Sequence, residues 1–168
     1  FIQGPGKLTA VDVYTGRIMW QRSLEDKEGY RPGRRGNDFE DQLSGFHFLA
    51  VEDSVYLVMV DRCVRIDPGN GRTLAEFRFE DPGDKWGSVQ VEGDMIIAEL
   101  FRQTEKFGLM PVEIVALNRQ TGQKQWSRKA ELSFPMHAIS GDRVYCFDGA
   151  LEDFYCDWRE LWFNQRVE

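Results

Sequence analysis

The sequence predicts an all-β fold of four-stranded antiparallel sheets, and three observations lead to that prediction. Apolar and polar residues alternate in short stretches between turn residues, and no long stretch with helical periodicity occurs before residue 150. One pattern occurs three times: a strand that ends in Asp or Asn, Gly four residues later and, in two copies, Trp four residues beyond the Gly. The three glycines, Gly16, Gly71 and Gly122, are 55 and 51 residues apart, about the length of one four-stranded blade with its loop. Together these observations predict a segment of a β-propeller.

The alternation predicts twelve strands, which is enough for about three blades. They are expected at residues 7–12, 17–22, 46–51, 54–60, 62–67, 73–79, 87–92, 95–101, 112–118, 124–130, 137–140 and 143–148. Tight turns alternate with other, mostly longer connections, expected at 23–45, 61–62, 80–86, 102–111 and 131–136. Because successive connections of an up-and-down meander alternate between the two ends of its strands, all the longer connections should emerge at one end, where binding residues are most often found.

Three side chains stand where a longer connection enters the next predicted strand, at nearly equivalent points of the repeats. They are His47, Trp86 and His137. These residues are the candidates for contact with a ligand or cofactor. The alternative is that the Trp is a packing anchor and that each His is hydrogen-bonded locally.

The repeated pattern has turn chemistry that explains its spacing. Asp12, Asp67 and Asn118 each close a strand, where a short side-chain acceptor can bind backbone N–H groups of the following turn. The glycine four residues later can adopt a left-handed conformation without a Cβ penalty, so the hairpin returns in register. In two copies the return strand carries a large indole, Trp20 or Trp126, which can reach a neighbouring sheet.

The pattern resembles the tryptophan-docking repeat of pyrroloquinoline-quinone-like (PQQ-like) β-propellers, in outline Ala-x-Asp-x-x-x-Gly-Lys-x-x-x-Trp. The matching residues are Ala10, Asp12, Gly16, Arg17 and Trp20 in the first copy and Ala116, Asn118, Gly122, Gln123 and Trp126 in the third. The resemblance covers about residues 7–148 and implies that Trp20 and Trp126 pack between adjacent blades. The second copy has Ala75 where Trp should stand, and Phe77, two residues further on, is the expected substitute.

Composition excludes several classes of protein. The 168 residues carry a net charge of −7, which argues against a nucleic-acid-binding surface. No apolar run approaches the ~20 residues that span a bilayer. Cys63, Cys146 and Cys156 are too scattered for a disulfide framework or a zinc motif, and Cys63 and Cys146 are expected to be buried free thiols within strands.

The sequence divides into a partial propeller over residues 1–148 and a tail over 149–168. Residues 150–163 change to helical periodicity and predict an amphipathic helix, which could bind a partner, dock on the propeller or link to a second domain. Asp148, Asp153 and Asp157 could hold Ca²⁺ in principle, but such spacing is common on solvated helices, so no metal site is predicted. The chain begins at Phe1 and holds about three of the four to eight blades of a closed propeller, so a fragment is expected.

The family resemblance frames two functions. Quinone-dependent dehydrogenases of this family are marked by a vicinal disulfide and a Ca²⁺ site, and the sequence has neither adjacent cysteines nor a stretch that aligns with that site. The prediction is therefore a non-catalytic scaffold without a cofactor, binding a protein partner or small ligand at the loop-rich end of a periplasmic, envelope or secreted protein. The alternative is part of a dehydrogenase whose PQQ and Ca²⁺ lie mainly in other blades. A third hypothesis joins the tail to a second, catalytic domain.

Overall fold

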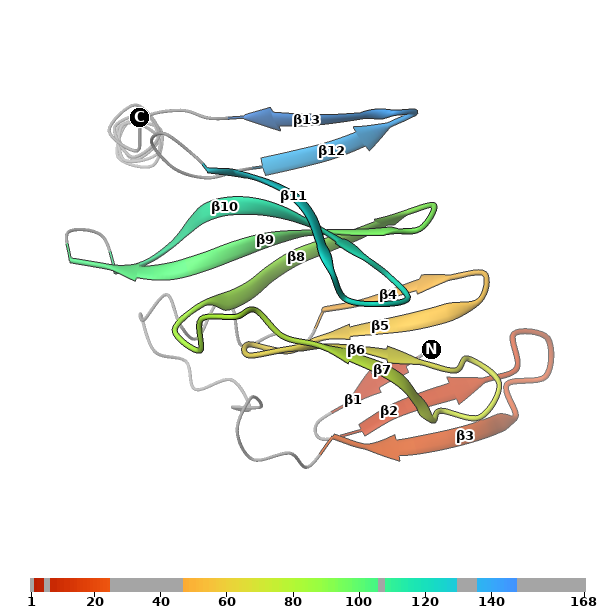
Figure 1. The fold of residues 1–168 in the computed structure, drawn as a ribbon. Coiled ribbons are helices and arrows are strands. Elements are labelled where there is room, and N and C mark those ends of the chain that lie inside the picture. The colour runs from red at the N-terminus through yellow and green to blue at the C-terminus, as the bar shows by residue number, and fades with distance from the viewer. Residues whose placement is uncertain (1, 5–6, 25–46, 106–107, 130–135, 148–168) are drawn as a thin grey trace, which may run out of the picture.

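The computed structural model describes residues 2–4, 7–24, 47–105, 108–129 and 136–147, and these form four antiparallel sheets (Figure 1). The first sheet contains β1 (Ile2–Gly4), β2 (Lys7–Val11) and β3 (Ile18–Ser23). The second contains β4 (His47–Val51), β5 (Ser54–Val58), β6 (Cys63–Ile66) and β7 (Thr73–Phe77). The third contains β8 (Lys85–Glu92), β9 (Met95–Thr104), β10 (Gly108–Asn118) and β11 (Lys124–Lys129), and the fourth contains β12 (Met136–Ser140) and β13 (Arg143–Phe147).

Each sheet is a meander in which neighbouring strands are consecutive in the chain, and the sheets follow one another in chain order (Figure 1). The all-β prediction is therefore confirmed. The tight turns after β4, β6, β8 and β10 lie at one end of the strands, here named the turn end. The connections after β5, β7 and β9 emerge at the opposite end, here named the connection end. The predicted tail helix lies outside the described residues.

Two strand predictions need correction. β1 was not predicted from the sequence. A loop was predicted at residues 102–111, where β9 and β10 instead continue as a paired hairpin from Pro111↔Phe101 to Gly108↔Thr104. Arg102 and Gln103 are exposed and polar, so this part of β9 lacks the apolar alternation that marks a half-buried strand.

The core consists of apolar clusters between successive sheets. β5 shows why: all five of its residues are buried. Val55 and Leu57 pack in a cluster with Leu8 of the first sheet, whereas Tyr56 and Val58 pack on the opposite face in a cluster with Ile96 of the third sheet. Because successive side chains of a strand point to opposite faces, β5 contributes to both cores. A smaller cluster joins the third sheet to the fourth.

The three copies of the sequence pattern form the same turn. Each begins after a register shift, at Ala10/Val11, Arg65/Ile66 or Ala116/Leu117. In each, the Asp or Asn oxygen accepts hydrogen bonds from turn groups, as from Thr15 N to Asp12 at 2.8 Å, Gly69 N to Asp67 at 2.7 Å and Thr121 N to Asn118 at 2.9 Å. The glycines have φ of 69°, 76° and 73°, in the left-handed region.

The aromatic residues of the pattern lie in different environments. Trp20 reaches the second sheet, where its indole lies over Gly71 and its Nε1 donates to the carbonyl of Pro68 at 2.8 Å. Phe77 takes the equivalent place one sheet further on, because its ring lies over Gly122. Trp126 is 38% exposed within the described chain.

The two cysteines of the described chain also differ in their burial. Cys63 is buried in the core, and burial raises the pKa of its thiol to about 12. Cys146 is exposed, so the prediction that it is buried is wrong. It lies near the end of β13, past the point where Val144 packs on the third sheet.

Candidate binding site

The three residues proposed from the sequence lie at the starts of equivalent strands. His47 is the first residue of β4, and Trp86 and His137 are the second residues of β8 and β12. Trp86 is only 3% exposed and stacks on Phe79 at 4.3 Å between ring centroids. Trp86 thus lies in the core between the second and third sheets, and the side chains of the two histidines lie outside the described residues. Ligand binding at these three positions stays a prediction.

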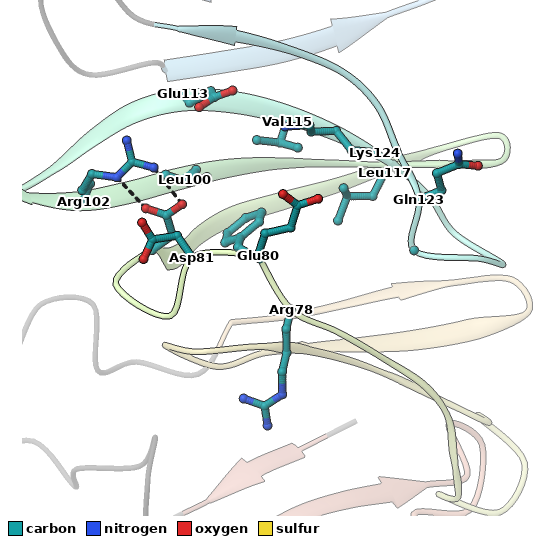
Figure 2. Close-up of a pocket in the computed structure, with 13 residues that line it drawn as sticks. Arg78, Glu80, Asp81, Leu100, Arg102, Glu113, Val115, Leu117, Gln123 and Lys124 are labelled. Atoms are coloured by element: carbon teal, nitrogen blue, oxygen red, sulfur yellow. Dashed lines mark hydrogen bonds and ion pairs between the residues drawn. The ribbon is translucent and has the colours of Figure 1, made fainter.

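The structure presents a groove of about 340 Å³ between the third sheet and the connection that reaches it from the second sheet, here named the inter-sheet groove (Figure 2). One wall is the connection from β7 to β8, and the other wall consists of β9, β10 and the start of β11. The lining residues are Arg78, Phe79, Glu80, Asp81, Asp84, Leu100, Arg102, Glu113, Val115, Leu117, Gly122, Gln123 and Lys124. This groove was not predicted from the sequence, and the one sequence feature that pointed to it is the charged connection predicted at residues 80–86.

A partly buried ion pair fixes the connection-end wall of the groove. The Arg102 guanidinium donates to both carboxylate oxygens of Asp84, at 2.6 and 2.8 Å, and the Asp84 side chain is 5% exposed. This hydrogen bonding raises the pKa of Arg102. The carbonyl of Asp81 accepts the Asp84 N–H at 3.0 Å, and the Asp81 carboxylate accepts the Gly83 N–H at 2.8 Å. The wall is therefore ordered by its own turn.

Arg78 is also neutralised, on the side away from the groove. Its guanidinium donates to Asp61 at 2.6 Å and to Glu76 at 2.8 Å, and these hydrogen bonds raise its pKa. Figure 2 shows the Arg78 side chain pointing away from β9 and β10, whereas Glu80 extends toward them. Both arginines of the lining are thus paired with carboxylates.

The charged side chains of the groove lining that form no ion pair within the described chain are mainly acidic. Glu80 and Glu113 form no hydrogen bond or ion pair with any residue that the structure describes, and the same holds for the amine of Lys124. Glu113 is only 9% exposed, and next to it lie the apolar residues Leu100 and Val115. The groove therefore offers carboxylate acceptors over an apolar floor, which suits a cationic group with an aliphatic stem.

A second polar cluster, at the turn end, has a structural role. Arg119 is 9% exposed and crosses from the third sheet to the second, donating to Asp53 at 2.6 Å and to the Tyr56 hydroxyl at 2.8 Å. Arg65 binds the other oxygen of Asp53 at 3.2 Å and the Ser54 hydroxyl at 2.7 Å. The hydrogen bond from Arg119 lowers the pKa of Asp53. Since these groups are already paired, the cluster holds two sheets together and leaves little for a ligand.

Within residues 2–4, 7–24, 47–105, 108–129 and 136–147, no three His, Cys, Asp or Glu side chains are grouped as metal ligands. The same part of the chain contains no helix with the length and apolar character of a membrane span.

Consecutive antiparallel sheets, three of which contain a copy of one Asp/Asn–Gly turn, define the class of protein as a β-propeller segment built from PQQ-like repeats. The family model described as outer membrane protein assembly factor BamB matches residues 4–152, and the chain belongs to this family. No curated protein gives a significant match. Among solved structures, BamB from Moraxella catarrhalis is similar with a TM-score of 0.45 and 17% identity. The match covers 88% of this chain and 54% of that one, so the chain spans about half the length of that BamB.

Proposed function

We propose that the chain is part of an envelope β-propeller that acts as a non-catalytic binding scaffold in the assembly of outer-membrane proteins. The observation that carries this proposal is the family match over residues 4–152, because the matched family is described as an outer membrane protein assembly factor. Shared fold alone does not transfer function, so the proposal also needs a suitable surface.

The connection end supplies such a surface. The connections after β5, β7 and β9 emerge there together, and the groove opens beside one of them (Figures 1 and 2). Loops held by a rigid sheet scaffold are where binding residues are most often placed. The proposed partner is a protein, and the proposed location is the periplasmic side of the envelope.

A genetic experiment tests the proposal in the source organism. Deletion of the gene should lower the amounts of β-barrel proteins in isolated outer membranes, measured by quantitative mass spectrometry, and the wild-type gene should restore them. Glu80→Lys, at the connection end, should restore them poorly. Glu92→Lys is the matched control, because it makes the same charge change at an exposed residue next to the turn after β8. Unchanged outer membranes after deletion would contradict the assembly role.

A second measurement separates the scaffold from the dehydrogenase alternative. The purified full-length protein is titrated with PQQ and Ca²⁺, followed by quinone absorbance and calorimetry, and then assayed for dye-linked oxidation of alcohols and sugars. We expect no stoichiometric binding and no turnover. Stoichiometric binding together with oxidation would replace the scaffold by a quinoprotein dehydrogenase.

A further inference from the structure

Glu113 lies on β10, in one wall of the inter-sheet groove. The residue is 9% exposed, and its carboxylate makes no hydrogen bond or ion pair within the described chain, although its charge interacts with that of Arg102 through space. Among the described residues, the fully buried side-chain polar atoms without a partner belong to Asp61 and Trp86, so the Glu113 oxygens keep access to solvent. Glu113 is thus an acceptor that a group entering the groove can bind.

The charge balance of the groove indicates the sign of the missing group. Arg102 is satisfied by Asp84, and Arg78 by Asp61 and Glu76. The remaining charged groups in the lining are three carboxylates, those of Glu80, Asp81 and Glu113, and one amine, that of Lys124. These four remaining side chains together carry a net negative charge, so the complementary occupant is a cation.

The size and floor of the groove narrow the choice of cation. A volume of about 340 Å³ is at the small end for ligand sites, and it suits one long side chain rather than a folded domain. Leu100, Val115 and Leu117 form an apolar floor against which a methylene stem can pack. A guanidinium is more weakly hydrated than an ammonium and binds carboxylates through a planar fork of donors, which favours arginine in a buried site.

We propose that the inter-sheet groove binds an arginine side chain of a partner protein, with Glu113 as the acceptor on β10 and Glu80 as a second acceptor on the opposite wall. That the arginine belongs to a protein rests on the scaffold function proposed above. The acidic subsite itself follows from the charge of the lining and from its apolar floor.

The test uses the full-length protein and two peptides that differ only in charge. Acetyl-Leu-Arg-Leu-amide is compared with the same peptide carrying citrulline, a neutral isostere of arginine. Binding is followed by NMR of the methyl groups of Leu100, Val115 and Leu117, which yields both the affinity and the location. The arginine peptide should bind saturably and shift these methyl signals, and the citrulline peptide should bind about tenfold more weakly, because it cannot form the charge-assisted hydrogen bonds.

Variants assign the effect to the groove. Glu113→Gln keeps the shape of the side chain and should weaken binding of the arginine peptide about tenfold, whereas Glu92→Gln, away from the groove, should leave it unchanged. If Glu113→Gln does not fold, Glu80→Gln at the exposed wall should still weaken binding measurably.

Three results would overturn the proposal: equal affinity for the two peptides, shifts at methyl groups outside the groove, or undiminished binding by folded Glu113→Gln protein. Spermidine that binds as tightly as the arginine peptide would also overturn it, by assigning the groove to a free polyamine. These outcomes are separate from the genetic test, since a scaffold can assemble outer-membrane proteins through another surface.

Discussion

Gly16 and Gly71 occupy the same position of the repeated turn, but only Gly71 lies beneath a side chain of another sheet. A Cβ at Gly71 would lie 2.7 Å from Trp20 Cε3, whereas a Cβ at Gly16 would meet no atom within 4 Å. Gly16→Ala should therefore cost only the left-handed backbone term, about 1–2 kcal/mol of unfolding free energy. Gly71→Ala should cost about 1–3 kcal/mol more, because the indole is held by its hydrogen bond to Pro68 and must move.

Urea unfolding of the two variants measures that difference directly. Since both glycines have positive φ, the comparison isolates the contact between the sheets. Equal losses of stability would show that Trp20 does not rest on Gly71 in solution.

Asp53 gives the molecule a defined response to acid. Its pKa is lowered chiefly by the hydrogen bond from Arg119, so the stability it contributes is present above its unfolded pKa of about 3.9. That contribution is lost as the pH falls through the lower, folded pKa. The difference in stability between wild type and Asp53→Asn should thus be constant from neutral pH down to about pH 5 and shrink below about pH 4.

Unfolding by urea at a series of pH values provides the measurement, with Glu52→Gln as the control. Glu52 is the exposed neighbour of Asp53 and forms no ion pair within the described chain. Because the Asp53 side chain is 54% exposed, the effect should be modest. If the stability difference between wild type and Asp53→Asn stayed the same down to pH 2, Asp53 would make no contribution to the acid response.

At the scale of the element, β7 places one aromatic residue on the third sheet and an aliphatic residue in solvent. Phe77 is 4% exposed, lies in the core with Trp86 and covers Gly122, whereas Leu74 on the same strand is 51% exposed. Phe77→Ala should cost about 3–5 kcal/mol, because it removes a large side chain from a packed core. Leu74→Ala, the matched control, should cost less than about 1 kcal/mol, and thermal or urea unfolding of both variants checks the ranking.

If Phe77→Ala cost no more than Leu74→Ala, the second and third sheets would not be joined through β7. By contrast, Trp126 is 38% exposed in the described chain, so the position of a Trp in the repeat does not by itself give its burial.

Elements whose signals are local were predictable from the sequence. The three turns follow from Asp12, Asp67 and Asn118 with their glycines, because each contact spans only a few residues. Phe77 was predictable as the substitute for the missing Trp because it follows Ala75 by two residues on the same strand face. The β9–β10 extension was not predictable, because its exposed polar residues do not alternate with apolar residues.

The inter-sheet groove was not predictable for a different reason. Glu113 and Glu80 belong to different walls, and their proximity to one groove depends on how the third sheet packs against the connection from β7. Arg102 and Asp84 likewise pair across 18 residues. No spacing in the sequence specifies such contacts, which arise from sheet packing rather than from periodicity.

At the scale of the whole molecule, stacking gives the strands unequal protection. Every residue of β5 is buried between cores on its two faces, whereas every residue of β11, at the edge of its sheet, is exposed. Local opening should therefore need close to the global unfolding free energy at β5 and much less at β11.

Hydrogen exchange followed by mass spectrometry or NMR should accordingly find the slowest amides in β5 and in the inner part of β10, around Val115 and Ala116, and faster amides in β11. β10 and β11 share a ladder of hydrogen bonds, so their comparison separates burial from secondary structure. Tyr56 and Leu57 point into different cores, yet they should exchange together, because opening β5 disrupts both interfaces at once. Protection confined to one of the two cores would mean that the sheets unfold as independent units rather than as one cooperative stack.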